Sequence, residues 1–230
     1  MSWISKYYDR RIASAPEKGL LWQVGHTENG QPITDDQFNA MVDRISNELD
    51  LQPDDVLLDL CCGNGAFTRI LAGHVRTAVG IDFSPALIAV AQKSSQASNL
   101  TYLSGDAKNP PRETKVGDRF NKVLMNAALQ HFSFSDFRSL LRDLVAQSTP
   151  DRMILLAFVP NSERRDEFEA TLKPGMALRL RRLFGRDLIG HWYSRETVTR
   201  LCAEMGLQAE FLPVDSSIDG SRYRINILIR

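Results

Sequence analysis

Residues 56–68 read VLLDLCCGNGAFT, an apolar run that ends in two glycines and is followed at once by a helical pattern. A short, continuous run of Val and Leu is typical of a strand buried on both faces of a parallel sheet. The glycines let the backbone turn tightly and approach a ligand without a Cβ in the way. The helix that follows presents unpaired N–H groups to whatever lies over the turn. The stretch therefore predicts a nucleotide-like ligand at the carboxyl edge of an open α/β sheet.

Two classes of cofactor bind at such a turn, and its residues favour one of them. The dinucleotide fingerprint is Gly-x-Gly-x-x-Gly, but Thr68 stands where the third glycine belongs. An acid, Asp59, comes shortly before Gly63 and Gly65. This arrangement resembles motif I of the class I S-adenosylmethionine (SAM) methyltransferases. On the residues alone, a glycine turn that only lets helix and strand pack stays open as the alternative.

The resemblance implies a role for the residues of this motif. In that family the acid, here Asp59, helps to hold the cationic amino-acid end of SAM through water or the backbone. The glycines, here Gly63 and Gly65, let the chain pass close to the ligand, and Cys61 lies in the same stretch. We therefore expect Asp59, Cys61, Gly63 and Gly65 to bind the cofactor.

The composition is that of an ordinary globular domain. The chain has 230 residues, 43% of them hydrophobic and 24% charged, which suits one large domain or one domain with an insertion. The formal net charge is +0, so no field of the whole chain draws it to nucleic acid or to a membrane. We therefore expect a small-molecule acceptor in preference to nucleic acid, and a homodimer stays open.

The cysteines and the N-terminal residues indicate a cytoplasmic protein. The chain has 3 cysteines, and the adjacent pair Cys61 and Cys62 has neither disulfide nor zinc spacing. We interpret them as small buried residues in a reducing compartment. Residues 1–15 are polar and charged, without the apolar core of a signal peptide, and no apolar run is long enough to span a membrane. We expect no metal site.

Residues 1–50 precede the expected SAM-binding domain, residues 51–230, and form an arm followed by a helix. Thr34 and Gln37 have the spacing of a capping box, which predicts that this helix begins after Thr34. The arm suits either a packed cover of the sheet edge or a lid over cofactor and acceptor. Its aromatic and charged residues include Trp3, Tyr7, Tyr8, Asp9, Arg10, Trp22 and His26.

The second strand is predicted at residues 78–82 and ends in an acid. Asp82 follows the glycine turn by about 20 residues, where a carboxylate accepts hydrogen bonds from ribose hydroxyls. We expect it to lie at an exposed place, so that its removal leaves the fold intact. Phe83 is placed to lie against the adenine. Ser84 is predicted to cap the next helix, with Pro85 in the first turn.

The third strand is predicted at residues 100–104, and Asp106 and Ala107 follow it closely. In the methyltransferase family an acid here hydrogen-bonds the adenine amino group. The resemblance therefore places Asp106 and Ala107 at the cofactor. The alternative for Asp106 is a turn residue that caps its own backbone.

The fourth strand is predicted at residues 120–125 and is closed by Asn126. The loop that follows is where the family lays its backbone along the methionine part of SAM, so Asn126 is expected at the cofactor. His131, in the same loop, is a proton acceptor suited to neutral pH. We predict it as the catalytic base, with a hydrogen-bonded structural histidine as the alternative. Tyr193 and His191 are the next candidates for the base.

The fifth strand, at residues 153–159, is followed by an insertion, residues 161–193. Insertions at this place commonly shape the acceptor pocket in the family, so we expect a cap. Residues 179–186 of the insertion read RLRRLFGR. An amphipathic cap helix with a solvated basic face is favoured, because the charges of the whole chain balance. A patch for RNA or for an anionic acceptor is the alternative.

Two final strands, at residues 208–214 and 223–229, are joined by a turn-rich segment. In the methyltransferase sheet the last strand inserts antiparallel between its neighbours, and a dinucleotide-binding domain does not end this way. We therefore predict an α/β fold with a doubly wound, seven-stranded, mostly parallel sheet. An antiparallel terminal hairpin and the insertion after strand five complete it.

Three functions follow from this interpretation. The first is a SAM-dependent methyltransferase that acts on a small molecule, most simply at a hydroxyl of a sugar or secondary metabolite. An alcohol acceptor needs a base, which His131 would supply, whereas an amine with a free lone pair needs none. The second is an RNA or protein methyltransferase that uses the basic insertion. The third is a SAM-binding partner subunit without catalysis.

Overall fold

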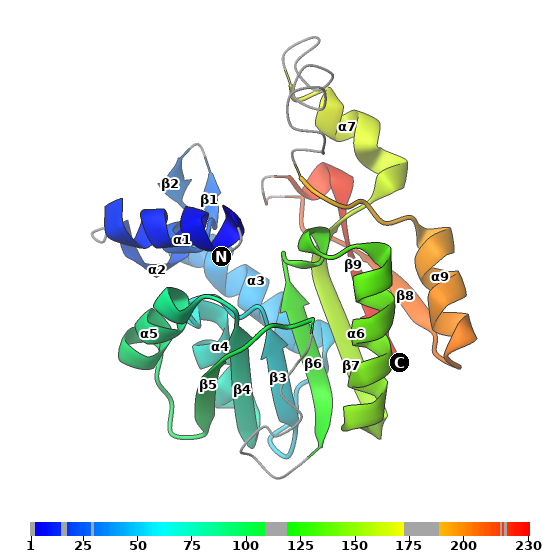
Figure 1. The fold of residues 1–230 in the computed structure, drawn as a ribbon, viewed down its shortest axis with the longest axis horizontal. Helices are drawn as coiled ribbons and strands as arrows, with labels where there is room; N and C mark the ends of the chain where they lie inside the picture. The colour runs from blue at the N-terminus through cyan, green and yellow to red at the C-terminus, as the bar shows by residue number, and fades with distance from the viewer. Residues whose placement is uncertain are drawn as a thin grey trace.

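A seven-stranded sheet forms the centre of the molecule, with the strand order β5-β4-β3-β6-β7-β9-β8 (Figure 1). The computed structural model describes residues 3–14, 18–28, 30–108, 119–172, 189–216, 218 and 220–230. The first five strands in this order, from β5 through β4, β3 and β6 to β7, are parallel. Strand β9 runs antiparallel between β7 and β8. The predicted fold class is confirmed. The strands are β3 (Val56–Leu60), β4 (Thr77–Asp82), β5 (Leu100–Ser104), β6 (Phe120–Asn126), β7 (Ser148–Pro160), β8 (Ala209–Pro213) and β9 (Arg224–Ile229).

Helices cover both faces of this sheet, as Figure 1 shows. Side chains alternate along β3, so Leu57 packs with α3 and α4 while Leu58 packs with α6 and α9. The helices are α1 (Trp3–Ser14), α2 (Gly19–Gln23), α3 (Asp35–Glu48), α4 (Ala66–Leu71), α5 (Pro85–Ser94), α6 (Phe134–Gln147), α7 (Arg165–Glu169) and α9 (Arg195–Glu204). Short 3-10 turns are η2 (Ala72–His74), η3 (Leu129–His131), η4 (Ser162–Arg164) and η5 (Ser221–Tyr223).

Polar caps begin the helices where the sequence predicts them. Thr34 Oγ1 accepts the Gln37 N–H at 3.2 Å, and Gln37 Oε1 accepts the Thr34 N–H at 2.9 Å. Ser84 Oγ accepts from the backbone at the start of α5, and Ser194 does the same for α9. Each cap satisfies an N–H that the helix itself cannot pair. The caps therefore fix where the strand-to-helix loops end.

Strand β7 begins earlier than predicted, at Ser148 and not at residue 153. Ser148 ends α6 and pairs with Phe120 across a register shift in the ladder. Residues 149–152 are polar and partly or fully exposed. A strand that starts at the exposed rim of a sheet lacks the apolar run on which the prediction relied.

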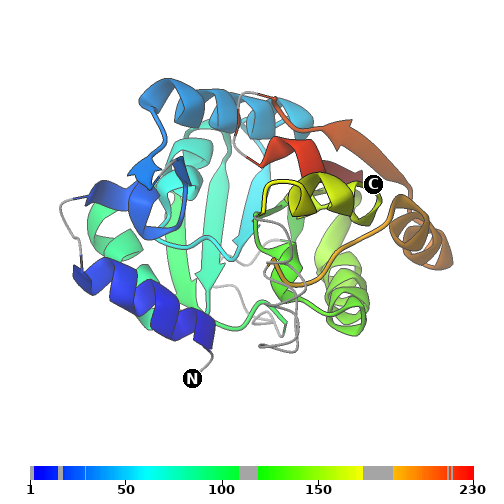
Figure 2. The same cartoon turned by 90° about the horizontal axis from the view of Figure 1, so that it is seen from above.

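Two groups of elements lie beyond the carboxyl ends of the parallel strands (Figure 1). The N-terminal group contains α1, α2 and a hairpin of β1 (Thr27–Glu28) and β2 (Gln31–Pro32). Seen from above in Figure 2, it lies on the β4–β5 side, and α7 lies on the side of β7 and β9. Residues 173–188 of the predicted cap, which hold its basic run, lie outside the described residues. Among the residues described, no helix is long and apolar enough to cross a membrane.

A buried amide holds the carboxyl end of β7 in place. The strand bulges there, and Phe158 adopts a left-handed φ of 60°. The Phe158 N–H donates to Asn226 Oδ1 at 2.8 Å, and Asn226 Nδ2 donates to Glu48 Oε2 at 2.7 Å. Asn226 is 5% exposed, so water cannot readily replace either bond. This side chain therefore joins β9, β7 and α3.

Replacement of Asn226 by Ala should lower the free energy of unfolding by about 1–3 kcal/mol, because the partly buried Phe158 N–H loses its acceptor. Urea unfolding followed by circular dichroism measures this loss. The matched control is Glu210→Ala, which removes an exposed ion pair with Arg230 at 2.9 Å and should cost less than about 1 kcal/mol. Equal losses in the two variants would contradict this account of the bulge.

Candidate active site

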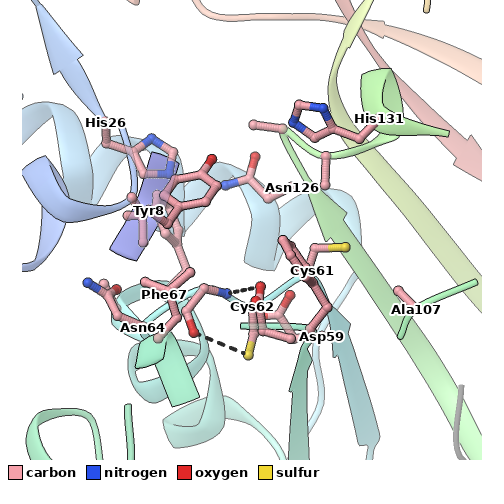
Figure 3. Close-up of a pocket in the computed structure, with 18 of the residues that line it drawn as sticks. Tyr8, His26, Asp59, Cys61, Cys62, Asn64, Phe67, Ala107, Asn126 and His131 are labelled. Carbon is pink, nitrogen blue, oxygen red and sulfur yellow. Dashed lines mark hydrogen bonds between the residues drawn. The ribbon is translucent and has the colours of Figure 1, made fainter. Parts of the chain in front are cut away.

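A cavity of about 420 Å³ opens at the carboxyl ends of β3, β4, β5 and β6 (Figure 3). Its volume lies within the range of about 300–1,000 Å³ that is usual for small-molecule sites. Each of the four strands sends residues into it, as the parallel topology requires. Of the predicted site residues, those that line it are Asp59, Cys61, Gly63, Asp82, Phe83, Asp106, Ala107, Asn126 and His131.

Asp82 joins the turns that follow β3 and β4. Its Oδ2 accepts the Gly63 N–H at 3.0 Å, and its Oδ1 accepts the Ser84 N–H at 2.9 Å. Burial raises the pKa of this carboxyl, and the two backbone hydrogen bonds oppose that rise. The residue is 4% exposed, so the expectation of an exposed acid is wrong. The Asp82 carboxylate thus positions the backbone at Gly63 and Ser84, and the N–H groups of that backbone hold the carboxylate in place.

The hydrogen bond from Thr68 to Asp59 explains why the motif has a threonine at this position. Thr68 Oγ1 donates to Asp59 Oδ2 at 2.6 Å, and both side chains are buried. Burial raises the pKa of Asp59 from its usual 3.8 to about 7, against the pull of the Thr68 bond, and the nearby Asp82 adds to the rise. A hydroxyl thus stands where a dinucleotide fingerprint needs a glycine, and it serves the acid of the motif.

The two glycines of the turn are needed for different reasons. Gly63 has φ +59°, and a Cβ there would lie 2.9 Å from Val24 Cγ1. Gly65 has φ +75°, and a Cβ there would lie 2.1 Å from the Tyr102 hydroxyl. Gly65 ends the turn as the N-cap of α4 and is not among the residues that line the cavity. Gly63 therefore lines the cavity, whereas Gly65 lies against Tyr102, and a cofactor contact at either glycine stays a prediction.

The adjacent cysteines are less enclosed than predicted. Cys61 and Cys62 are partly exposed, and both line the cavity. Cys61 has a left-handed φ of 60°, a conformation that favours glycine. Burial and the neighbouring acids raise the pKa of both thiols, so they are neutral near pH 7. No group of three His, Cys, Asp or Glu side chains in the described ranges could hold a metal ion.

Asp106 combines the two alternatives drawn from the sequence. Its Oδ1 accepts the Lys108 N–H at 2.9 Å, as in a turn that caps itself. The residue is exposed and lines the cavity at the end of β5. Asp106 can therefore cap its own turn and still lie at the edge of the sheet where the cavity opens.

The loop that carries His131 is braced from the far end of the insertion. His131 belongs to η3 and lines the cavity. The buried Tyr193 hydroxyl donates to the carbonyls of Phe132 at 2.6 Å and Leu129 at 3.2 Å. The His191 N–H donates to the Gln130 carbonyl at 2.8 Å. One segment far along the chain, residues 191–193, thus holds the loop at the edge of the cavity.

These contacts remove the two fallback candidates for the base. Burial raises the pKa of the Tyr193 hydroxyl, and that hydroxyl is bound to the loop carbonyls. The His191 side chain is exposed and lines a second, smaller cavity of about 220 Å³. The structure therefore gives Tyr193 a positioning role and leaves His191 outside the main cavity.

Sequence reasoning missed the residues that the N-terminal arm brings to the cavity. Tyr8, Val24 and His26 all line it. The His26 ring packs against Phe67 with 4.8 Å between ring centroids, and burial lowers the pKa of His26 to about 4. Its imidazole is therefore neutral at pH 7. The cluster of aromatic residues in the arm was the available signal, but no local pattern says which of them face inward.

The cavity is acidic. Three carboxylates line it, those of Asp59, Asp82 and Asp106. Lys108 is the one Lys or Arg among its described lining residues, and Lys108 Nζ lies 2.6 Å from the Asp136 carboxylate. A surplus of acids attracts a cationic ligand and repels an anionic one. The site therefore suits a ligand with positive groups and disfavours the pyrophosphate of a dinucleotide.

The chain is similar to known methyltransferases. Residues 57–151 match a family described as a methyltransferase domain. The chain is 33% identical over 94 residues to the 23S rRNA (uracil(1939)-C(5))-methyltransferase RlmD of Aliivibrio salmonicida (strain LFI1238), which covers 39% of this chain and 22% of that protein. It spans about a quarter of the length of the curated relatives that it matches.

Two solved structures have the same fold over nearly the whole chain. The DhpI-SAM-HEP complex matches with a TM-score of 0.63 and 17% identity, over 99% of this chain and 95% of that one. Magnesium protoporphyrin IX methyltransferase (ChlM) from Synechocystis PCC 6803 with bound SAH matches with a TM-score of 0.62 and 14% identity, over 98% of this chain and 97% of that one. At these identities the likeness shows a shared fold.

The matched family region contains the core of the site. Residues 57–151 run from β3 into β7 and include the acids at three successive strand ends. The same region holds Asn126 and His131. Together with the sheet order and the acidic cavity, the match resolves the choice between the two cofactor classes. Residues 57–151 are therefore similar to a methyltransferase domain, and the chain shares the fold of solved structures that contain SAM or SAH.

Proposed function

We propose that the protein transfers a methyl group from SAM to a hydroxyl of a small-molecule acceptor, such as a sugar or secondary metabolite. The observation that carries this proposal is the acidic cavity, which is built by four neighbouring strand ends. Across the sheet from β5 to β6 they contribute Asp106, Asp82, Asp59 and Asn126. SAM has a sulfonium and an ammonium group, and both are cations. The charge of the cavity therefore agrees with this cofactor.

Each acid has a chemical task towards the cofactor. The Asp82 carboxylate would accept hydrogen bonds from the ribose hydroxyls, and Asp59 would support the cationic amino-acid end. Phe83 would lie against the adenine, whose amino group Asp106 would bind, with Ala107 beside it. When bound, SAM supplies an electrophilic methyl group. The protein aligns the acceptor with it in a site shielded from water, which can contribute about 7–11 kcal/mol.

His131 is the proposed base on the acceptor side. A hydroxyl must lose its proton as its oxygen attacks, and a neutral imidazole at the edge of the cavity can take it. Tyr193 holds the loop at the carbonyls on either side of His131. Such bracing keeps the loop that carries the imidazole in one place.

An RNA or protein acceptor is the second candidate. The likeness to RlmD favours RNA, although it covers 22% of that protein, and residues 179–186 are basic. RNA binding through such a run weakens steeply with salt. A catalytically silent SAM-binding subunit is the third candidate, and it predicts no methyl transfer to any acceptor.

Transfer of labelled methyl from SAM separates these candidates. The protein is incubated with SAM carrying a labelled methyl group and with fractions of a cell extract that contain small molecules, RNA or protein. The proposal predicts label in the small-molecule fraction. Label confined to RNA or protein would contradict it, and absence of label in all fractions would favour the silent subunit.

The affinity for SAM should depend on pH through Asp59. Its pKa of about 7 means that the carboxyl must ionise before it can support a cation, so affinity should fall as pH drops below about 7, by up to about tenfold per pH unit. Calorimetry from about pH 5 to about pH 9 measures this. In Asp59→Asn the affinity should be lower and nearly independent of pH. A variant that keeps the wild-type slope would refute the assignment to Asp59.

In the unliganded protein the same shift acts in the opposite direction. Folding raises the pKa of Asp59 from 3.8 to about 7, so the folded state binds more protons than the unfolded state between these values. The contribution of this group to stability therefore falls as the pH rises through that window. Asp59→Asn should remove this part of the pH dependence of urea unfolding.

Replacement of His131 by Ala should lower kcat by about 10²–10⁴ on the acceptor that the label identifies, because the base is lost. SAM affinity should stay nearly unchanged, since His131 is proposed to face the acceptor. Single-turnover rates and melting temperatures are measured on the same samples. The control is His191→Ala, whose side chain lies outside the main cavity. A destabilised His131 variant with full turnover per folded molecule would end the base hypothesis.

A further inference from the structure

The side chain of the middle residue of the cofactor turn binds the N-terminal arm. Asn64 lies between the two glycines and is 0% exposed. Its Nδ2 donates to the Leu20 carbonyl at 2.9 Å and to Gln23 Oε1 at 3.0 Å. Gln23 is itself buried. One amide thus satisfies both of its N–H groups on α2, which fixes its orientation.

Further contacts join the arm to the same turn. Val24 packs on Gly63 so closely that a Cβ there would lie 2.9 Å from its Cγ1. The ring of His26 packs on Phe67 at the start of α4. The arm, residues 18–28, is therefore attached to the turn at three successive points. Only the Asn64 contact is made by hydrogen bonds to two groups at once.

A second set of contacts extends this attachment to α1. Arg11 Nε donates to the Trp22 carbonyl at 2.9 Å, and its guanidinium lies 4.1 Å from the centroid of the Trp22 ring. Tyr8 lies one helical turn before Arg11 and lines the cavity. Displacement of α2 would therefore also move the helix that carries Tyr8.

The arm and α1 together form one wall of the cavity. Figure 3 shows Tyr8 and His26 on one side, His131 on the other, and Asn126 between them. Val24 completes the wall above the glycine turn. A ligand bound at Asp59 and Asp82 would therefore have the arm as its immediate cover on this side.

We propose that Asn64 is a positioning residue whose hydrogen bonds to Leu20 and Gln23 hold the arm over the bound cofactor. We call this contact the latch. It must break before S-adenosylhomocysteine (SAH) can be released. Docking of the arm and occupation of the turn then stabilise each other, because both hold the backbone at Gly63 and Asn64 in one conformation. Such coupling is reciprocal. This inference rests on the proposed function only in taking SAM and SAH as the ligands.

The test measures SAH, which needs no acceptor. Asn64→Ala should release SAH about tenfold faster than the wild type, which corresponds to about 1.4 kcal/mol, in a stopped-flow experiment. Hydrogen exchange of residues 18–28 should be slowed by SAH in the wild type and much less in the variant. Gln23→Ala loosens the same contact from the side of the arm and should act in the same direction. It keeps the test valid if Asn64→Ala fails to fold.

Asn99 provides a matched control. Its Nδ2 donates to the carbonyls of Ala72 at 2.8 Å and Val75 at 2.9 Å, at the opposite end of the sheet from the cavity. Asn99→Ala therefore removes the same number of strong amide contacts without touching the arm. It should lose stability and keep the wild-type rate of SAH release.

A double-mutant cycle between Asn64→Ala and Gln23→Ala tests the pairing itself. The double variant should release SAH little faster than either single variant, because both remove one contact. Wild-type release in Asn64→Ala, or an equal effect of Asn99→Ala, would overturn the latch alone. Failure of the wild type to bind SAH would overturn the proposed function and the latch together.

Discussion

The Asp82 carboxylate connects two neighbouring strand ends, and the geometry of the site depends on it. Its two oxygens hold the N–H groups of Gly63 and Ser84, so the turn after β3 and the start of α5 share one anchor. Hydrogen bonds to a charged group each contribute about 1.5–3 kcal/mol. These two bonds oppose the rise in the pKa of Asp82 that its burial causes. The turn that faces the ligand is thus fixed before any ligand arrives.

The other contacts of the turn build on this anchor. Thr68 donates a hydrogen bond to Asp59. The Tyr102 hydroxyl lies so close to residue 65 that only a glycine fits there. Asn64 is directed towards the arm because the backbone on both sides of it is already set. The result is a cavity with acids on one wall and neutral aromatic and imidazole groups on the other. The burial of several acids in one place opposes stability, and a cationic cofactor relieves it.

Local patterns were sufficient to predict the strands that end at the site. Val and Leu runs, capping residues and the acids at strand ends are signals within a few residues. The predicted mostly parallel, seven-stranded sheet and the predicted caps agree with the structure. Contacts between distant segments were out of reach. The role of Gly65 depends on Tyr102, and that of Tyr193 on carbonyls in another loop. Asp82 was predicted to be exposed because residues at strand ends usually are. In the structure the turn after β3 covers it.

The arm shows the same limit most clearly. Its aromatic residues could be read as a cover or a lid, and the sequence held nothing to say that Asn64 would bind it. A single asparagine within a glycine turn is compatible with either of the two cofactor classes. The contact that Asn64 makes depends on Gln23 of α2, which lies 41 residues earlier in the chain.

The most direct measurement of the central claim is calorimetric titration of the wild type and of Asp82→Asn with SAH and with NAD. The account predicts that the wild type binds SAH and not NAD, because the cavity is acidic and Thr68 replaces the third glycine. The folded Asp82→Asn variant should lose about tenfold or more in SAH affinity, since it loses the carboxylate that holds the turn and that we propose to bind the ribose. Tight binding of NAD by the wild type, or unchanged SAH affinity in the folded variant, would contradict it.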